Sequence, residues 1–137
     1  MAKHVVAAVE ALPPGSRKLV DVDGRPIVIF NVKGEYFALR NRCPHQGGNL
    51  YEGKLTGLIA SPEPGRYEYS RQGEILRCPW HGWEFDIRTG KSCIDPTRIR
   101  VKSYPVDVES GRHLVEGPYV AETVPVTVEA EYVVVDV

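Results

Sequence analysis

Four side chains that bind soft metal ions occur in two short segments of this chain. One residue separates Cys43 from His45, and two residues separate Cys78 from His81. Together they offer two thiolates and two imidazoles, which can be shared between two metals or gathered around one. In a 2Fe-2S cluster of mixed ligation, one iron takes both cysteines and the other takes both histidines. The two spacings permit this span, so we expect the four side chains to hold one 2Fe-2S cluster.

The residues beside the four ligands suit such a cluster. Pro44 and Pro79 stiffen the two loops. Gly47 and Gly82 allow the backbone to approach a cluster closely and to direct amide groups at its sulfurs. Hydrogen bonds of this kind stabilise the reduced, more negative state and so tune the reduction potential. The second ring nitrogen of each histidine usually points outward, and we expect electrons to leave there.

A structural zinc site is the main alternative for the four ligands. Tetrahedral zinc also binds sets of two cysteines and two histidines. Common zinc patterns pair like residues, two cysteines and then two histidines, at spacings that this chain lacks. The ligand pattern therefore favours the cluster over zinc.

The third cysteine, Cys93, has no evident partner in the sequence. The number of cysteines is odd and two of them lie beside histidines, so a disulfide framework is the poorer explanation. We interpret Cys93 as a small buried hydrophobic residue. Cysteine usage of this kind fits a reducing compartment, and the cytoplasm is the expected location.

Length and charge restrict the partners of the protein. A chain of 137 residues has the usual size of one domain, so a single domain is expected over residues 1–137. Lys and Arg number 17 against 18 Asp and Glu, without a long run of one sign, which argues against nucleic acid as a partner. Neither a signal peptide nor a membrane span is evident. We therefore expect no membrane partner, and a monomer or weak dimer.

The local pattern is that of an all-β protein. Thirteen glycines and eleven prolines interrupt runs that are rich in Val, Ile, Tyr and Phe. Residues 17–22, 25–32 and 35–39 are predicted to form three consecutive strands. Asp23-Gly24 and Lys33-Gly34 supply the tight turns between them. An antiparallel meander follows from this arrangement.

A second hairpin carries one of the two metal-binding segments. Residues 74–77 and 83–87 read as its strands, and residues 78–82 form the loop that connects them. An exit turn follows at residues 88–91. The cysteine segments thus fall at strand ends and loop tips. Apolar residues at helical spacing do not persist for a dozen residues anywhere, so no long helix is expected.

Two further segments lie outside the predicted meander and the second hairpin. The polar stretch of residues 61–73 is predicted to be an exposed loop or a small hairpin. Residues 104–109 (YPVDVE) recur in similar form as residues 124–129 (VPVTVE). This echo predicts two similar hairpins in tandem, the second of them an added edge hairpin at about residues 117–137.

The two cysteine segments resemble those of the Rieske iron-sulfur family. Residues 78–86 (CPWHGWEFD) are similar to the soluble, ferredoxin-type branch, and the resemblance covers roughly residues 17–115. It implies a Rieske-type antiparallel β-sandwich in which a small cluster-binding subdomain, about residues 41–95, projects from a larger β base. It also makes Asp95-Pro96 the candidate for a third loop that covers the cluster.

This sequence differs from the respiratory branch of that family at residues that affect the reduction potential of the cluster. That branch has an additional cysteine in each cluster loop, joined in a disulfide, whereas Gln46 to Asn49 and Trp80 stand at those places here. It also places Ser and Tyr hydroxyls near the second loop, where Trp83 and Phe85 cannot donate the same hydrogen bonds. The resemblance therefore implies the low end of a range that runs from about −150 to +300 mV.

The resemblance implies an electron carrier and not an enzyme. An oxygenase needs a second iron, held by two histidines and a carboxylate, and only His4 and His113 remain for it. We therefore expect the chain to pass single electrons from a flavin or iron-sulfur reductase to a terminal oxygenase. The alternative is a redox-sensing or docking subunit of a larger oxidoreductase, as in the small subunit of a nitrite reductase.

Overall fold

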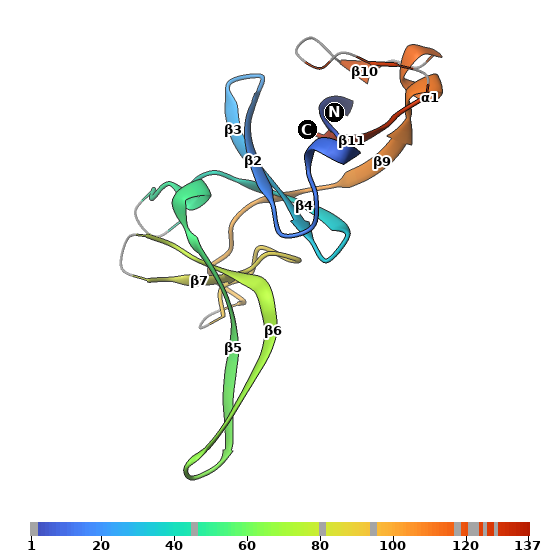
Figure 1. Ribbon diagram of the computed structural model, residues 1–137. Helices are drawn as coiled ribbons and strands as arrows, with labels where there is room; N and C mark the ends of the chain where they lie inside the picture. Colours follow the sequence, from blue (N-terminus) through green and yellow to red (C-terminus); the bar gives the residue numbers. More distant parts are fainter. Residues whose placement is uncertain are drawn as a thin grey trace. The chain divides into compact units, whose positions relative to one another are not determined.

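A computed structural model shows a protein of mainly antiparallel β-sheet with little helix (Figure 1). The structure describes residues 3–44, 47–79, 82–93, 96–116, 119–120, 124, 126–127 and 129–137. The chain divides into two compact units: a terminal unit, Met1–Arg40 with Ser103–Val137, and a central unit, Asn41–Lys102. The predicted all-β fold class is confirmed.

The terminal unit contains two four-stranded sheets. Its elements in chain order are β1 (Lys3–Ala8), the 3-10 helix η1 (Val9–Ala11), β2 (Arg17–Val22), β3 (Arg25–Val32), β4 (Glu35–Arg40), β8 (Ser103–Tyr104), β9 (Val106–Ser110), α1 (Gly111–Glu116), β10 (Tyr119–Val120) and β11 (Glu131–Asp136). One sheet has the strand order β2-β3-β4-β8 and the other the order β10-β1-β11-β9. In the described part of the chain, no helix is long and apolar enough to cross a membrane.

The predicted meander is confirmed in β2, β3 and β4, which pair as neighbours in antiparallel register (Figure 1). Asp23 and Lys33 begin its two turns with positive φ angles of 51° and 53°, as two-residue hairpin turns of this hand require. Asp21 and Asn31 accept hydrogen bonds from the turn amides of the residues three positions on, at 2.9 and 2.8 Å. Tight turns therefore fix the register of this sheet.

The core of the terminal unit lies between the two sheets. Strands β1 and β11 direct alternate side chains to opposite faces of their sheet. One face packs on the meander in a cluster of Val6, Leu12, Val22, Ile27, Ile29, Ala38, Tyr104, Val133 and Val135. The other face packs on helix α1 in a cluster of Val5, Leu114, Tyr132 and Val134. The strand β11 is thus buried on both faces.

The C-terminal segment differs from the expected edge hairpin at about residues 117–137. Strand β10 pairs in parallel with β1, and β11 lies between β1 and β9. The two strands are therefore not partners of each other. The Val-rich run at Val133–Val135 is buried, with exposed fractions of at most 2%, and such a run suits a central strand better than an edge. Burial in the core determined the strand pairing of this segment, which the repeated sequence pattern did not predict.

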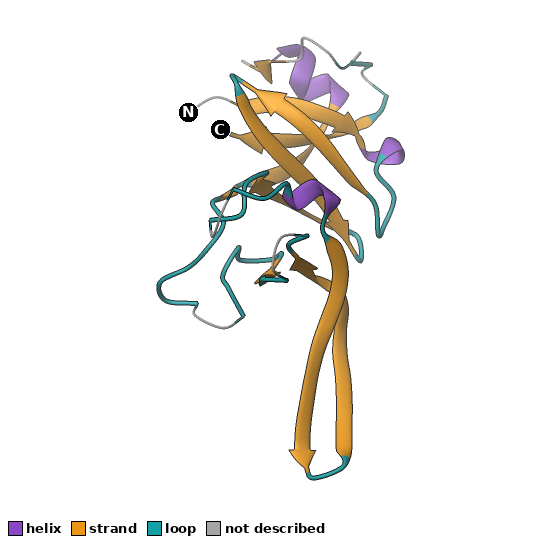
Figure 2. Cartoon of the chain, turned by 90° about the vertical axis from the view of Figure 1, so that its left-hand side faces the viewer, coloured by secondary structure: helices purple, strands orange, loops and turns teal. Residues whose placement is uncertain are grey.

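The central unit contains a three-stranded antiparallel sheet of order β5-β6-β7. Its elements are the 3-10 helix η2 (Leu50–Glu52), β5 (Lys54–Glu63), β6 (Arg66–Arg77) and β7 (Glu84–Asp86). Strands β5 and β6 form a long hairpin (Figure 2). The predicted hairpin of residues 74–77 and 83–87 is present as the pairing of β6 with β7. The polar stretch at residues 61–73 is the distal end of the β5–β6 hairpin.

Candidate metal centre

The two predicted sulfur ligands lie directly after strands. Cys43 follows β4 by three positions, and Cys78 is the first residue after β6. Each cysteine is 2% exposed, and neither forms a disulfide. Pro44 and Pro79, the next residues, are exposed. Each loop therefore buries its cysteine next to a solvent-exposed proline. The two predicted nitrogen ligands, His45 and His81, lie outside the described residues.

The same backbone hydrogen bond closes both cysteine loops. The amide N–H of Cys43 donates to the carbonyl oxygen of Gly48 at 2.9 Å, and that of Cys78 donates to the carbonyl oxygen of Trp83 at 2.7 Å. In each case the acceptor is the fifth residue after the cysteine. The first loop has an additional bond from the Gly47 N–H to the Cys43 carbonyl oxygen, at 2.7 Å. The two loops thus give their thiols equivalent backbone support.

A glycine stands four residues after each cysteine, and both adopt the left-handed conformation. The φ angles are +75° at Gly47 and +69° at Gly82. A residue with a Cβ is strained in this region, by about 1–2 kcal/mol. The sequence predicted these glycines from close approach to a cluster. The structure adds a second reason, because each loop must reverse at this point to bring the closing carbonyl back to the cysteine.

Asn41 holds the base of the first loop. Its side-chain amide N–H donates to the Asn49 side-chain oxygen at 2.8 Å, and its own side-chain oxygen accepts the Tyr51 amide N–H at 2.7 Å. One side chain thus bridges the residues before and after the loop. The sequence analysis missed this role, and the only signal for it was an asparagine on each side of the first cysteine segment.

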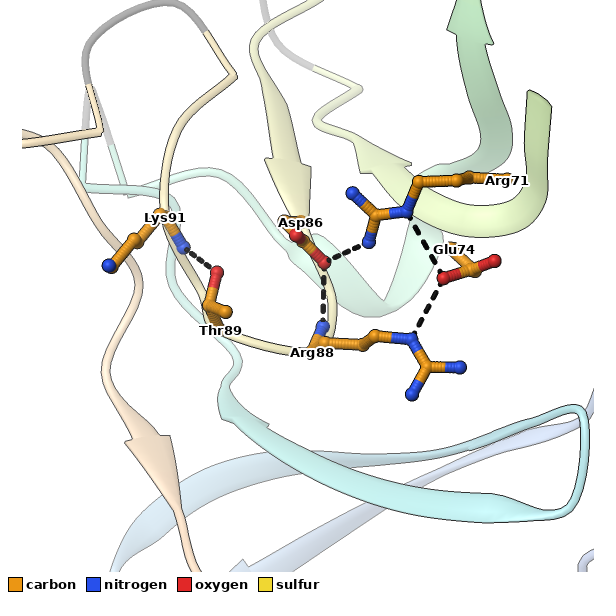
Figure 3. Close-up of polar contacts among 6 residues, drawn as sticks. All are labelled: Arg71, Glu74, Asp86, Arg88, Thr89 and Lys91. Carbon is orange, nitrogen blue, oxygen red and sulfur yellow. Dashed lines mark hydrogen bonds and ion pairs between the residues drawn. The ribbon is translucent and has the colours of Figure 1, made fainter. Parts of the chain in front are cut away.

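Ion pairs hold the strands that carry the second loop (Figure 3). Glu74 on β6 is buried, and its carboxylate accepts hydrogen bonds from Arg71 at 3.2 Å and from Arg88 at 2.8 Å. Asp86 at the end of β7 accepts from the Arg71 guanidinium at 2.9 Å and from the Arg88 amide N–H at 3.0 Å. The Asp86 hydrogen bond and the Glu74 carboxylate raise the pKa of Arg71. This four-residue network ties β6 to β7 and was not predicted.

The donor set therefore fits an iron-sulfur cluster. Buried thiols without a disulfide, on two loops with matching closure, are suited to bind one metal from two sides. A Rieske 2Fe-2S domain matches residues 2–105 of the chain. The chain belongs to the Rieske 2Fe-2S family. It carries one Rieske-type cluster.

Relatives of this Rieske chain are components of bacterial oxygenase systems. It is 32% identical over 109 residues to the biphenyl dioxygenase ferredoxin subunit of Pseudomonas sp. (strain KKS102), covering 80% of this chain and 86% of the relative. It is 30% identical over 106 residues to the ferredoxin component of the naphthalene 1,2-dioxygenase/salicylate 5-hydroxylase systems of Ralstonia sp., covering 77% and 86%. Both matches include most of each protein.

Solved structures share the fold of this Rieske chain. The ferredoxin of carbazole 1,9a-dioxygenase from Nocardioides aromaticivorans IC177 superimposes with a TM-score of 0.63. Its sequence is 22% identical, and the match covers 97% of each chain. At this identity the likeness concerns the fold alone. It agrees with the antiparallel sheets described above and supports the predicted Rieske-type architecture.

Cys93 is not the buried residue that the sequence suggested. It is exposed, on the segment after β7, and its amide N–H donates to the Glu84 carbonyl oxygen at 3.0 Å. Partial desolvation raises the pKa of its thiol, and the carboxylates of Glu84 and Asp86 raise it further. A protonated thiol is a poor metal ligand and nucleophile. The interpretation as a buried residue was wrong because the backbone pairing of this segment turns the side chain outward.

The remaining predicted features are only partly described. Trp83 is half-buried and Phe85 is fully buried, so both pack in the region where the sequence placed them. In the candidate covering loop, Pro96 is exposed, while Asp95 lies outside the described residues. Trp80 also lies outside them. The covering role of Asp95-Pro96 therefore stays a prediction.

Proposed function

We propose that this protein carries single electrons from a flavin or iron-sulfur reductase to a terminal oxygenase, with Cys43, His45, Cys78 and His81 as the ligands of its cluster. The observation that carries this proposal is the pair of matched loops, each of which buries a cysteine that forms no disulfide within three residues of the end of a strand. The relatives to which the chain is similar are ferredoxin components of oxygenase systems, which supports this role.

The four proposed ligands bind different irons of the cluster. The thiolates of Cys43 and Cys78 would hold one iron, and the imidazoles of His45 and His81 would hold the other. When bound, the cluster takes up and releases one electron. The chain keeps the thiols dry, because both are buried, and exposes the turn beside each of them at Pro44 and Pro79. A partner that docks on these turns comes close to the cluster without unfolding any part of the protein.

The compartment and the potential follow from the same residues. None of the cysteines Cys43, Cys78 and Cys93 forms a disulfide, which suits the reducing cytoplasm that we propose as the location. We also propose a potential at the low end of the Rieske range. Trp83 and Phe85 offer no hydroxyl to the second loop, and the cluster there lacks the donors that stabilise the reduced state.

Spectroscopy and one substitution test the proposal. The purified protein is expected to be reddish brown, to contain acid-labile sulfide, and to give an electron paramagnetic resonance signal only after reduction. His81→Cys should retain a cluster but lower its potential, because a thiolate adds negative charge. His113→Cys, at an exposed position, is the matched control and should leave the potential unchanged. A colourless protein that holds one zinc ion, or an unchanged potential in His81→Cys, would contradict the ligand assignment.

A further inference from the structure

An arginine directly precedes the cysteine of each loop and lies against the glycine of the same loop. A Cβ built on Gly47 would meet the Arg42 Nε at 3.5 Å, and one built on Gly82 would meet the Arg77 Nε and Nη2 at 2.9 Å each. Gly82 therefore leaves space that the Arg77 guanidinium occupies, whereas at Gly47 the Arg42 guanidinium lies at an ordinary contact distance. The sequence Arg-Cys-Pro occurs in both loops, at residues 42–44 and 77–79. The same charged group thus has the same place in both halves of the site.

These two guanidinium groups are available to a partner. Arg42 and Arg77 are exposed, and neither has an ion-pair partner among the residues that the structure describes. Glu84 lies opposite Arg77 in the β6–β7 pairing, but its carboxylate accepts a hydrogen bond from the Thr56 hydroxyl at 3.3 Å. By contrast, Arg71 is already engaged by Glu74 and Asp86. Within the described chain, no carboxylate neutralises the two loop arginines.

The charge of the whole central unit has the same sign. Residues 41–102 contain ten Lys and Arg against seven Asp and Glu, a formal charge of +3, although the complete chain has a net charge of −1. The terminal unit therefore has a formal charge of −4. A nearly neutral protein thus places its excess positive charge in the unit that contains both cysteine loops. Such asymmetry orients a protein during diffusional encounter.

We propose that Arg42 and Arg77 form a cationic docking site on the two cysteine loops for an acidic surface of a redox partner. The inference rests on the proposed electron-carrier function and adds the charge of the surface that the partner presents. Because each arginine is adjacent to a thiolate ligand, a carboxylate that pairs with it brings the partner within a few residues of the cluster. The contacts that attract the partner thereby also select the orientation that is productive for electron transfer.

Direct electrochemistry of the cluster-loaded protein tests this site without knowledge of the partner. A gold electrode coated with a carboxylate-terminated alkanethiol layer serves as the acidic surface, and an amine-terminated layer is the reference. Wild-type protein should exchange electrons at least about fivefold faster at the carboxylate layer at low ionic strength. The difference should disappear as salt is raised, because screening weakens exposed charges. A rate that is equal on both layers, or that is insensitive to salt, would overturn the proposal.

Substitutions assign the effect to the two arginines. The double variant R42Q/R77Q should lose most of the preference for the carboxylate layer, and R42K/R77K should keep it, because lysine retains the charge. Arg25→Gln removes the same charge from an exposed site of the terminal unit and should change little. Iron content and the resonance signal of each variant establish that the loops still bind the cluster. If R42Q/R77Q does not load, the single substitutions and the salt dependence of the wild type decide the question.

The result also separates this inference from the proposed function. A wild-type protein that gives a reversible one-electron signal on both layers, with no effect of R42Q/R77Q, is still an electron carrier but does not dock through these arginines. A wild-type protein that gives no one-electron signal on either layer would refute the electron-carrier function itself.

Discussion

The terminal unit and the central unit differ in the kinds of internal contact that stabilise them. The terminal unit closes two sheets around an apolar cluster and adds a second cluster beneath helix α1. The central unit also buries apolar side chains, among them Leu50, Ile75, Leu76 and Phe85. Its two cysteine loops and the strands that carry them add polar contacts: loop amides bonded to carbonyls, the bridging side chain of Asn41, and a buried Glu74 between two arginines. A metal-binding loop must present its ligands at a surface, and so it cannot bury itself in a thick apolar layer. Directional polar bonds hold such a loop where packing cannot.

The comparison predicts that the two units respond differently to substitution. A change in the apolar clusters should reduce the stability of the terminal unit and leave the properties of the cluster intact. A change in the ligands of the central unit should alter cluster loading, and a change in its buried polar contacts should lower the stability of that unit.

Loss of a sulfur ligand should have the largest effect. Cys78→Ser removes one of the two buried thiols on which the proposed cluster depends, so iron and acid-labile sulfide should fall nearly to zero. Cys93→Ser is the matched control, because it removes an exposed thiol from the same unit. It should retain full loading. Iron and acid-labile sulfide are measured in both purified variants. A Cys78→Ser variant with the full iron and sulfide content would exclude Cys78 as a ligand.

Truncation in the terminal core should be the next largest effect. Ile29 is 0% exposed and belongs to the cluster between the two sheets. Ile29→Ala should lower the free energy of unfolding by about 2–5 kcal/mol, through lost burial and a cavity. The reduction potential of the folded protein should not change. Val108→Ala, at a position that is 42% exposed, is the control and should stay within about 0.5 kcal/mol of the wild type.

Removal of the buried carboxylate should test the polar network of the central unit. Glu74→Gln leaves the guanidinium groups of Arg71 and Arg88 without their shared partner. The expected loss is about 2–3 kcal/mol of unfolding free energy, since a buried pair is broken on one side only. Urea denaturation measures it. Glu68→Gln breaks an exposed pair with Arg66 and should cost less than about 1 kcal/mol. An equal loss of unfolding free energy in the two variants would mean that the buried network stabilises the protein no more than an exposed ion pair does.

The smallest effect concerns the reactivity of Cys93. Burial and the nearby carboxylates of Glu84 and Asp86 raise the pKa of its thiol. A raised pKa lowers the fraction of thiolate at any given pH, so alkylation by iodoacetamide should reach its half-maximal rate above the usual thiol value of about 8.5. Glu84→Gln removes a negative charge and should shift the profile toward lower pH. A profile centred at or below the ordinary value would contradict the expected environment.

Local sequence predicted the parts of the fold that local chemistry specifies. The meander followed from Asp23-Gly24 and Lys33-Gly34, because few residue pairs accept the backbone of a two-residue hairpin turn. Strand β5 was not predicted, since its register shifts between Thr56 and Leu58 interrupt the alternation of side chains. Strand β1 was also not recognised as a strand. The apolar run at residues 5–8 of this strand reflects burial on both faces, which alternation does not reveal.

In the candidate site, too, some residues could be predicted from the sequence and others could not. Cys43 and Cys78 were predicted from residue type and spacing, and the structure buries both thiols in loops with matching closure. The supports of those loops were not predictable. Asn41, Glu74 and Arg88 belong to common residue types. The bond from Asn41 to Asn49 spans 8 positions of the sequence, and that from Arg88 to Glu74 spans 14. Only the folded chain shows which carboxylate faces which guanidinium.

Residue types and their spacing were enough to identify the family and its cluster and to predict the two loops that hold it, because ligand chemistry requires particular residues at particular spacings. The tertiary structure decided which strand became central in the terminal unit, that Cys93 faces outward, and that Arg42 and Arg77 lie against the loop glycines. Each of these depends on contacts between segments that are brought together by burial or by a loop reversal. Such contacts leave no fixed pattern along the chain, and so they are settled only when the whole backbone is in place.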